Sequence, residues 1–193
     1  EKDTQNIREA VLRYEIEHPV VNDADHAVWN RFGIRSWPSL VLIDPEGNAV
    51  RLWQGETKFE ELDGVLQKAI PFYEKKGQLD RKPIQFDLEA YKATQTPLRY
   101  PGKVLATADR VFIADSNHHR IVVTNPQGEL LDIIGSGSSG RDDGGYDRAA
   151  FQFPQGMALL GEKLYVADTA NHLIRMVDLE KREVRTIAGT GEQ

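Results

Sequence analysis

The stretch Ala114-Asp115-Ser116-Asn117-His118-His119-Arg120-Ile121 returns 53 positions later as Ala167-Asp168-Thr169-Ala170-Asn171-His172-Leu173-Ile174. The same offset aligns residues 98–123 with 151–176 without gaps. After one inserted residue the correspondence resumes, so that Ile134-Gly135 matches Ala188-Gly189. An internal repeat of this length indicates a solenoid or a propeller.

Each repeat contains four short runs with the composition of β-strands. Asn125-Pro126-Gln127-Gly128 and Glu180-Lys181-Arg182 provide turns between runs. Four antiparallel strands per repeat describe a propeller blade. The expected strands cover about 103–107, 110–114, 119–124 and 129–134 in the first repeat, and about 156–160, 163–167, 172–178 and 183–188 in the second.

Both quoted segments resemble the NHL repeat, and the second contains the naming triplet Asn171-His172-Leu173. The resemblance covers residues 98–193 and implies an NHL-type β-propeller, of which this chain carries about two blades. A closed propeller ring in that family usually contains six blades. Two blades leave β edges and apolar flanks uncovered. We therefore expect an internal fragment of a longer protein that can associate through unpaired blade edges.

The repeated polar residues are expected to be structural turn residues. A carboxylate at the end of a strand accepts backbone N–H groups in a tight turn. The alternative is a metal or catalytic site, because Asp and His are also ligands, but ligands need not recur in every repeat. The residues concerned are Asp115, His119, Asp168, Asn171 and His172, with His118 as a further turn residue.

A glycine-rich motif, Gly135 to Gly140, matches G-x-G-x-x-G. A dinucleotide fold would begin a helix there, but the following Arg141-Asp142-Asp143-Gly144-Gly145 breaks helices. The acidic residues of this loop fit no EF-hand spacing. We therefore predict an inter-blade loop and neither a cofactor nor a metal.

Residues 1–77 alternate between helix and strand patterns. The apolar spacing predicts a helix over 4–17 with Thr4 as N-cap, a strand at 19–21, and a short helix capped by Asp25. A strand at 39–44, buried on both faces, and a strand at 49–54 flank a tight turn. A final helix starts near Lys58; Pro71 should kink it or end its regular hydrogen bonding, and Gly77 should stop it. Trp29 and Trp53 are expected in the core.

That order of elements resembles the C-terminal two-thirds of a thioredoxin-like domain, on the residues Phe32-Gly33-Ile34-Arg35-Ser36-Trp37-Pro38-Ser39 and the hairpin after them. The resemblance implies a cis bond before Pro38; without it, a trans proline opening a strand is the alternative. Trp37, Pro38 and Ser39 form a candidate groove for a partner or substrate. The family's Cys-x-x-Cys has no counterpart, since the chain contains no cysteine.

The fold class is accordingly multi-domain, α/β followed by all-β, with residues 1–77 thioredoxin-like, a Pro-punctuated linker at 78–97, and NHL repeats over 98–193. Within the linker, Ile84, Phe86, Leu88 and Tyr91 indicate packing onto another element. No apolar run approaches the ~20 residues of a membrane helix. The net charge of −6 argues against nucleic-acid binding. Zero cysteines fit the cytoplasm, although the compartment stays open.

The function expected from these features is a non-enzymatic protein-interaction or scaffold module with a protein partner. The first alternative is a thiol–disulfide oxidoreductase whose Cys-x-x-Cys lies upstream of Glu1. The second alternative is a metal-dependent propeller hydrolase or lyase. The third alternative is RNA binding, which the negative net charge disfavours. Whether the whole protein is an enzyme stays open. For this chain the sequence argues against catalytic activity, because it has no cysteine and no catalytic set of residues.

Overall fold

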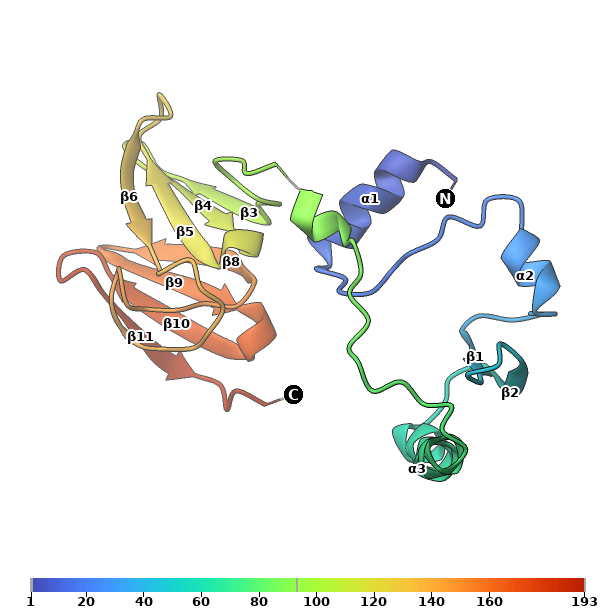
Figure 1. Ribbon diagram of the computed structural model, residues 1–193. Helices are drawn as coiled ribbons and strands as arrows, with labels where there is room; N and C mark the ends of the chain where they lie inside the picture. Colours follow the sequence, from blue (N-terminus) through green and yellow to red (C-terminus); the bar gives the residue numbers. More distant parts are fainter. Residues whose placement is uncertain (1, 93, 193) are drawn as a thin grey trace. The chain divides into compact units, whose positions relative to one another are not determined.

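The computed structural model describes residues 2–92 and 94–192 and divides into two compact units, Glu1–Ala93 and Thr94–Gln193 (Figure 1). The first unit combines helices with a two-stranded sheet, whereas the second consists mainly of β-strands. The chain therefore joins an α/β part to a β-rich part. Among the described residues, no helix is long and apolar enough to cross a membrane.

Helix α1 (Thr4–Arg13) opens the first unit. The Asp3 carboxylate accepts hydrogen bonds from the backbone N–H groups of Gln5 and Asn6, at 2.8 and 3.0 Å. The N-cap is therefore Asp3, and the prediction of Thr4 was wrong by one position. The helix also ends before residue 17, and residues 19–21 form no strand. An extended segment is stable as a strand only beside a pairing neighbour, and the unit's sheet pairs β1 with β2 alone.

Helix α2 (Ala27–Arg31) is a short helix held at its start by Asp23 rather than by the predicted Asp25. The Asp23 carboxylate accepts the backbone N–H groups of Val28 and Trp29, at 3.0 and 2.8 Å. These bonds, first that from Trp29, lower the pKa of Asp23. Gly33 ends the helix with a φ of 64°, a left-handed conformation that glycine adopts without a steric penalty.

Strands β1 (Ser39–Ile43) and β2 (Ala49–Gln54) form the predicted antiparallel hairpin. The Asp44 carboxylate shapes its turn by accepting the backbone N–H groups of Glu46 and Asn48, at 2.9 and 2.8 Å. The expectation that β1 is buried on both faces was wrong, since Leu40 and Ile43 are nearly half exposed. A two-stranded sheet has too few neighbours to cover both faces of a strand.

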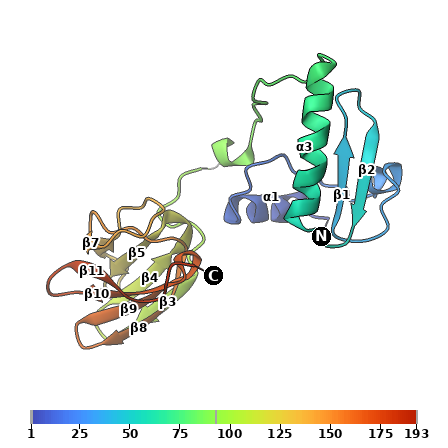
Figure 2. The same cartoon turned by 90° about the horizontal axis from the view of Figure 1, so that it is seen from below.

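Helix α3 (Phe59–Lys75) runs alongside the hairpin (Figure 2). The indole N–H of Trp53 donates to Glu61 on this helix at 2.9 Å, and the Tyr73 hydroxyl lies 3.4 Å from the Asp44 carboxylate. Pro71 does not end the helix, because the following turn keeps its backbone hydrogen bonds as far as Gly77. Gly77 then stops it at a φ of 70°.

The first unit buries few apolar side chains. Of its described residues, only Val11 and Trp53 count as buried hydrophobics. Trp53 thus lies in the core as predicted, whereas Trp29 is half-buried. The 3-10 turn η1 (Glu89–Lys92) packs on α1, where Arg8 and Glu89 form an ion pair at 2.9 Å.

The second unit contains two antiparallel sheets. Sheet 1 has the strand order β3-β4-β5-β6, and sheet 2 has the order β7-β11-β10-β9-β8. Each repeat supplies four consecutive strands, close to the predicted bounds, and the connecting loop adds the short β7 to the edge of sheet 2. The strands are β3 (Lys103–Ala106), β4 (Val111–Asp115), β5 (Arg120–Thr124), β6 (Leu130–Ile134), β7 (Gly144–Gly145), β8 (Pro154–Leu160), β9 (Lys163–Asp168), β10 (Leu173–Asp178) and β11 (Glu183–Ala188).

The hydrophobic core of this unit lies between the two sheets. Strand alternation places one face of each sheet inward. Sheet 1 contributes Phe112, Ala114, Ile121, Val123 and Ile134, and sheet 2 contributes Leu164, Val166, Val177 and Val184. The loop between the repeats closes the core with Tyr146, Ala149 and Phe151.

Candidate functional site

An exposed aromatic surface surrounds Trp37 in the first unit. The Trp37 side chain is 78% exposed, and its ring lies 4.7 Å from that of the half-buried Trp29. The peptide bond from Trp37 to Pro38 is cis, as predicted. His26 extends the aromatic row, with its ring edge-on to Trp29 at 6.2 Å. We call Trp29, Trp37 and Pro38 the tryptophan platform.

Local hydrogen bonds fix the backbone around the tryptophan platform. The Pro38 carbonyl accepts the backbone N–H of Gly55 at 2.7 Å. The Ser39 hydroxyl donates to the Ser36 carbonyl at 2.7 Å, so it is engaged within the chain. Asp23 holds the start of α2 and with it Trp29. Of the three predicted groove residues, Trp37 and Pro38 are therefore the two that face solvent.

The repeated aspartates lie at equivalent turns of the two sheets and are both fully buried. One oxygen of Asp115 accepts the backbone N–H of Arg99 at 2.6 Å, and one oxygen of Asp168 accepts that of Gln152 at 2.7 Å. In both cases the donor lies 16 residues earlier. Each carboxylate thus ties the start of its repeat to the end of the second strand.

The second oxygen of each aspartate accepts side-chain donors. Asp115 receives His118 Nδ1 at 2.9 Å and Arg120 Nε at 2.8 Å. Asp168 receives Asn171 Nδ2 and an Arg175 guanidinium N–H, at 2.8 and 2.9 Å. His118 and Asn171 are equivalent positions, which explains why a histidine and an asparagine can exchange here: both present a nitrogen donor to the carboxylate.

His119 and His172 end these turns with left-handed backbones, at φ values of 51° and 53°. The His119 ring packs edge-on against Phe153, with centroids 5.0 Å apart, while His172 is exposed. The Nδ1 atom of His119 accepts the backbone N–H of Phe153 at 3.4 Å. Within residues 2–92 and 94–192, no group of three or more His, Asp or Glu side chains is placed to hold a metal ion.

The glycine-rich stretch Gly135–Gly140 forms a loop and starts no helix, so no helix N-terminus is available for a pyrophosphate. Gly135 has a φ of 106°, and its backbone N–H donates to the Tyr146 carbonyl at 2.8 Å. In the acidic part of the loop, Asp143 accepts Thr186 and Arg175. Burial raises the pKa of Asp143, but these hydrogen bonds outweigh it and hold the pKa below the ordinary value.

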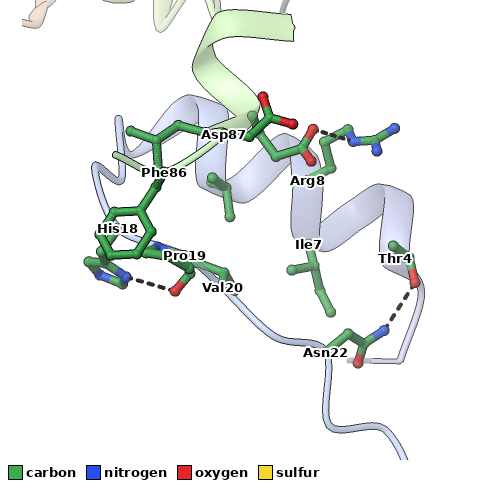
Figure 3. A pocket seen from close by; sticks show the side chains of 12 residues that line it. Thr4, Ile7, Arg8, His18, Pro19, Val20, Asn22, Phe86 and Asp87 are labelled. Carbon is green, nitrogen blue, oxygen red and sulfur yellow. Dashed lines mark hydrogen bonds and ion pairs between the residues drawn. The ribbon is translucent and has the colours of Figure 1, made fainter. Parts of the chain in front are cut away.

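A pocket of about 280 Å³ lies between α1, the segment that follows it, and residues 86–89 (Figure 3). The predicted packing of the 78–97 segment explains part of this pocket, because Phe86 and Leu88 line it, although Ile84 and Tyr91 are mostly exposed. The polar groups around it are engaged locally: Asn22 donates to Thr4 at 3.1 Å. The sequence pattern carried no signal for the pocket, since its walls come from segments about 80 residues apart.

Comparison with known proteins found close relatives along the whole chain. No protein-family model matches. The chain is 44% identical over 195 residues to NHL repeat-containing protein 2 of Gallus gallus and 42% identical over 195 residues to that of Homo sapiens. It is 43% identical over 199 residues to Protein SUPPRESSOR OF QUENCHING 1, chloroplastic, of Arabidopsis thaliana.

These alignments cover 99–100% of this chain but only a part of each relative. The chain spans 27% of the two NHL repeat-containing proteins and 19% of the plant protein. A solved structure from Bacteroides thetaiotaomicron overlaps 42% of this chain and 21% of its own chain, at 26% identity and with a TM-score of 0.39. From end to end, the chain is therefore similar to proteins named for NHL repeats, at 42–44% identity.

Proposed function

We propose that this chain is a non-enzymatic protein-interaction module, built from a thioredoxin-like unit and NHL β-propeller repeats. The observation that carries the proposal is the exposure of Trp37, at 78%. Tryptophan is among the residues most enriched at the centres of protein interfaces, because it removes a large apolar area from water while its N–H stays available.

The tryptophan platform has the rigidity that recognition favours. The Trp37 ring packs against the Trp29 ring, and the backbone N–H of Trp29 donates to the Asp23 carboxylate. A surface that is already ordered loses less conformational entropy on binding than a mobile one does. Strand β1 begins directly beside the platform at Ser39 and pairs on one side with β2. The partner chemistry that fits is a protein segment with an exposed apolar side chain.

The polar residues of the repeats support the same reading. The carboxylates of Asp115 and Asp168 already accept three hydrogen bonds each from their own repeat. Groups used in this way stabilise turns and are not poised for proton transfer or ligation. The repeats therefore serve as a scaffold in this proposal.

The test is selection of a random peptide library on the immobilised chain, followed by affinity measurement on variants. We expect enriched peptides to bind Trp37→Ala at least about tenfold more weakly than the unchanged chain. Tyr91→Ala is the matched control, because Tyr91 is 77% exposed in the same unit. Peptides that bind both variants as tightly as the unchanged chain would show that the platform is not the binding surface.

A further inference from the structure

Thr96 lies in the short segment that leads into the first repeat, and its neighbours are those of a protein-kinase substrate. It is the one serine or threonine of the chain that a proline follows, and the third residue after it is basic, in Thr96-Pro97-Leu98-Arg99. Proline-directed protein kinases accept, directly after the hydroxyl residue, a residue that has no backbone N–H and a fixed φ. The sequence therefore makes Thr96 a candidate for phosphorylation.

The structure leaves Thr96 accessible to another protein. Residues 94–97 are exposed and belong to neither a helix nor a strand. The Thr96 hydroxyl donates to the Leu98 carbonyl at 2.5 Å, which is a local hydrogen bond on the surface. An exposed segment outside the sheets can enter the cleft of an enzyme without disrupting the core.

The guanidinium of Arg120 binds the same short segment. Its Nη2 donates to the Pro97 carbonyl at 2.9 Å, and its Nε donates to the Asp115 carboxylate at 2.8 Å. The Arg120 side chain is 24% exposed, so part of the guanidinium reaches solvent. Thr96 and Arg120 thus bind the carbonyls of two adjacent residues, Leu98 and Pro97, and a group added to the Thr96 hydroxyl would lie beside the guanidinium.

The second repeat shows how the equivalent arginine is held by two anions. Arg175 donates to the Ala150 carbonyl at 2.7 Å and to Asp168 at 2.9 Å, and these two residues are the counterparts of the two partners of Arg120. Arg175 also pairs with a second carboxylate, that of Asp143, at 2.9 Å. Among the described residues, Arg120 pairs with one carboxylate. A guanidinium has five N–H donors, so Arg120 can accommodate a second anion as Arg175 does.

We propose that Thr96 is phosphorylated by a proline-directed serine/threonine protein kinase and that its phosphate pairs with Arg120. In the transfer, the Thr96 Oγ forms a bond to the γ-phosphorus of ATP, the bond from that phosphorus to the bridging oxygen breaks, and ADP leaves. The hydroxyl proton passes to the catalytic carboxylate of the kinase. The phosphate oxygens then accept from Arg120 in the way that Asp143 accepts from Arg175.

The charges of the segment favour a phosphate at this position. Residues 94–108 include Arg99 and Lys103 and no acidic residue. A phosphothreonine carries about −1.5 to −2 charges at pH 7 and stabilises a segment that lies beside an arginine, whereas neighbouring carboxylates would repel it. The carboxylate of Asp115 is fully buried and already paired with Arg120. Phosphorylation would therefore fasten the start of the first repeat to strand β5.

The first test is phosphoryl transfer to the whole chain from a cyclin-dependent kinase with ATP, followed by intact-mass measurement and peptide mapping. We expect one phosphoryl group per chain, on Thr96. Thr96→Ala and Pro97→Ala should each lose it. Thr94→Ala is the matched control, because Thr94 is exposed in the same segment but precedes a glutamine, and it should be modified like the unchanged chain. A chain that accepts no phosphoryl group on Thr96, or incorporation that survives Pro97→Ala, would overturn the proposed site.

The second test asks whether the phosphate pairs with Arg120. The phosphorylated chain and a phosphorylated peptide of residues 94–99 are titrated and followed by ³¹P NMR. A neighbouring guanidinium favours the dianion, so the second pKa of the phosphate should be lower in the chain than in the peptide by at least about 0.5. Arg120→Gln should restore the value of the peptide. Arg110→Gln is the control, because the Arg110 side chain is also 24% exposed but pairs with Glu162.

Far-UV circular dichroism checks that Arg120→Gln keeps its sheets, and Arg120→Lys is the milder replacement, which should restore the phosphate pKa only in part. Equal phosphate pKa values in the chain and the peptide would overturn the pairing. So would a lowered value that neither Arg120 variant changes.

Discussion

Arg175 and Arg120 perform the same task from different positions. Arg120 reaches Asp115 from the first residue of β5, whereas Arg175 reaches Asp168 from the third residue of β10. The fully buried Arg175 also donates to the carbonyls of Ala150 and Asp142, both at 2.7 Å. It thereby joins the loop between the repeats to the centre of sheet 2.

Replacement of Arg175 by Met should destabilise the second unit by about 3–5 kcal/mol, because it leaves the buried Asp168 without its cationic partner. Arg185→Met is the control: Arg185 pairs with Glu183 on the surface, and a change of at most about 1 kcal/mol is expected there. Urea unfolding followed by far-UV circular dichroism and by hydrogen exchange of β9 and β10 measures the difference. Equal effects of the two variants would show that Arg175 is not the anchor of this loop.

Tyr146 gives the second unit a dependence on alkaline pH. Burial raises its pKa from 10.0 to about 12. The unfolded chain releases this proton near pH 10, so the stabilisation is complete below pH 10 and is lost as the pH rises toward 12. Tyr146→Phe should remove the contribution of Tyr146 to the decrease in stability between pH 10 and 12. Tyr91→Phe in the first unit should leave that decrease unchanged. Unfolding midpoints measured across this pH range would contradict the account if both variants behaved alike.

At the scale of elements, each repeat places a glycine against the turn histidine. Gly189 has a φ of 99°, and a Cβ atom there would lie 2.2 Å from the His172 carbonyl oxygen. Its counterpart Gly135 approaches the His119 carbonyl, with a corresponding distance of 3.3 Å. The last strand of each repeat can therefore leave the sheet only through a residue without a side chain.

Gly189→Ala should destabilise the second unit more than Gly128→Ala does. Both glycines have a positive φ, so each substitution costs about 1–2 kcal/mol in backbone conformation. Only at Gly189 does the added methyl group collide with backbone, whereas the site of Gly128 is open. Thermal unfolding of the two variants compares them directly, and a larger effect at Gly128 would exclude the close approach as the reason for Gly189.

The repeat elements could be predicted from sequence because each strand is flanked by its own turn residues, such as Asn125 to Gly128. The elements of the first unit were less predictable at their ends. The side chains that start α1 and α2 belong to Asp3 and Asp23, and neither stood at the expected position. Several polar residues near a helix start can serve as caps, and the backbone geometry decides among them.

The candidate site was predictable in part for the same reason. Trp37 and Pro38 stand out in the sequence, but the stacking of Trp29 beneath Trp37 depends on how α2 is oriented. Arg175 gave no signal, because its counterpart in the first repeat is Val122. The arginine that pairs with the buried aspartate lies two positions further along in the second repeat than in the first. An alignment of the two repeats therefore does not reveal it.

At the scale of the whole molecule, the two units differ in how they are stabilised. The second unit encloses a continuous core between two sheets, whereas the first unit relies on a few polar contacts, such as that of Trp53 with Glu61. The three tryptophans all lie in the first unit, at positions 29, 37 and 53. Spectroscopic signals from the tryptophan side chains therefore report on the first unit alone. Two of the three tryptophans belong to the tryptophan platform.

The most direct measurement of the central claim is ¹⁹F NMR of the chain labelled with fluorotryptophan, titrated with a selected peptide. Each of the three signals is assigned by a single Trp→Phe substitution. If the tryptophan platform binds the peptide, the Trp37 signal should shift most, Trp29 less, and the buried Trp53 least. Saturable binding that leaves the Trp37 signal in place would contradict the claim that this chain recognises proteins through its exposed tryptophan.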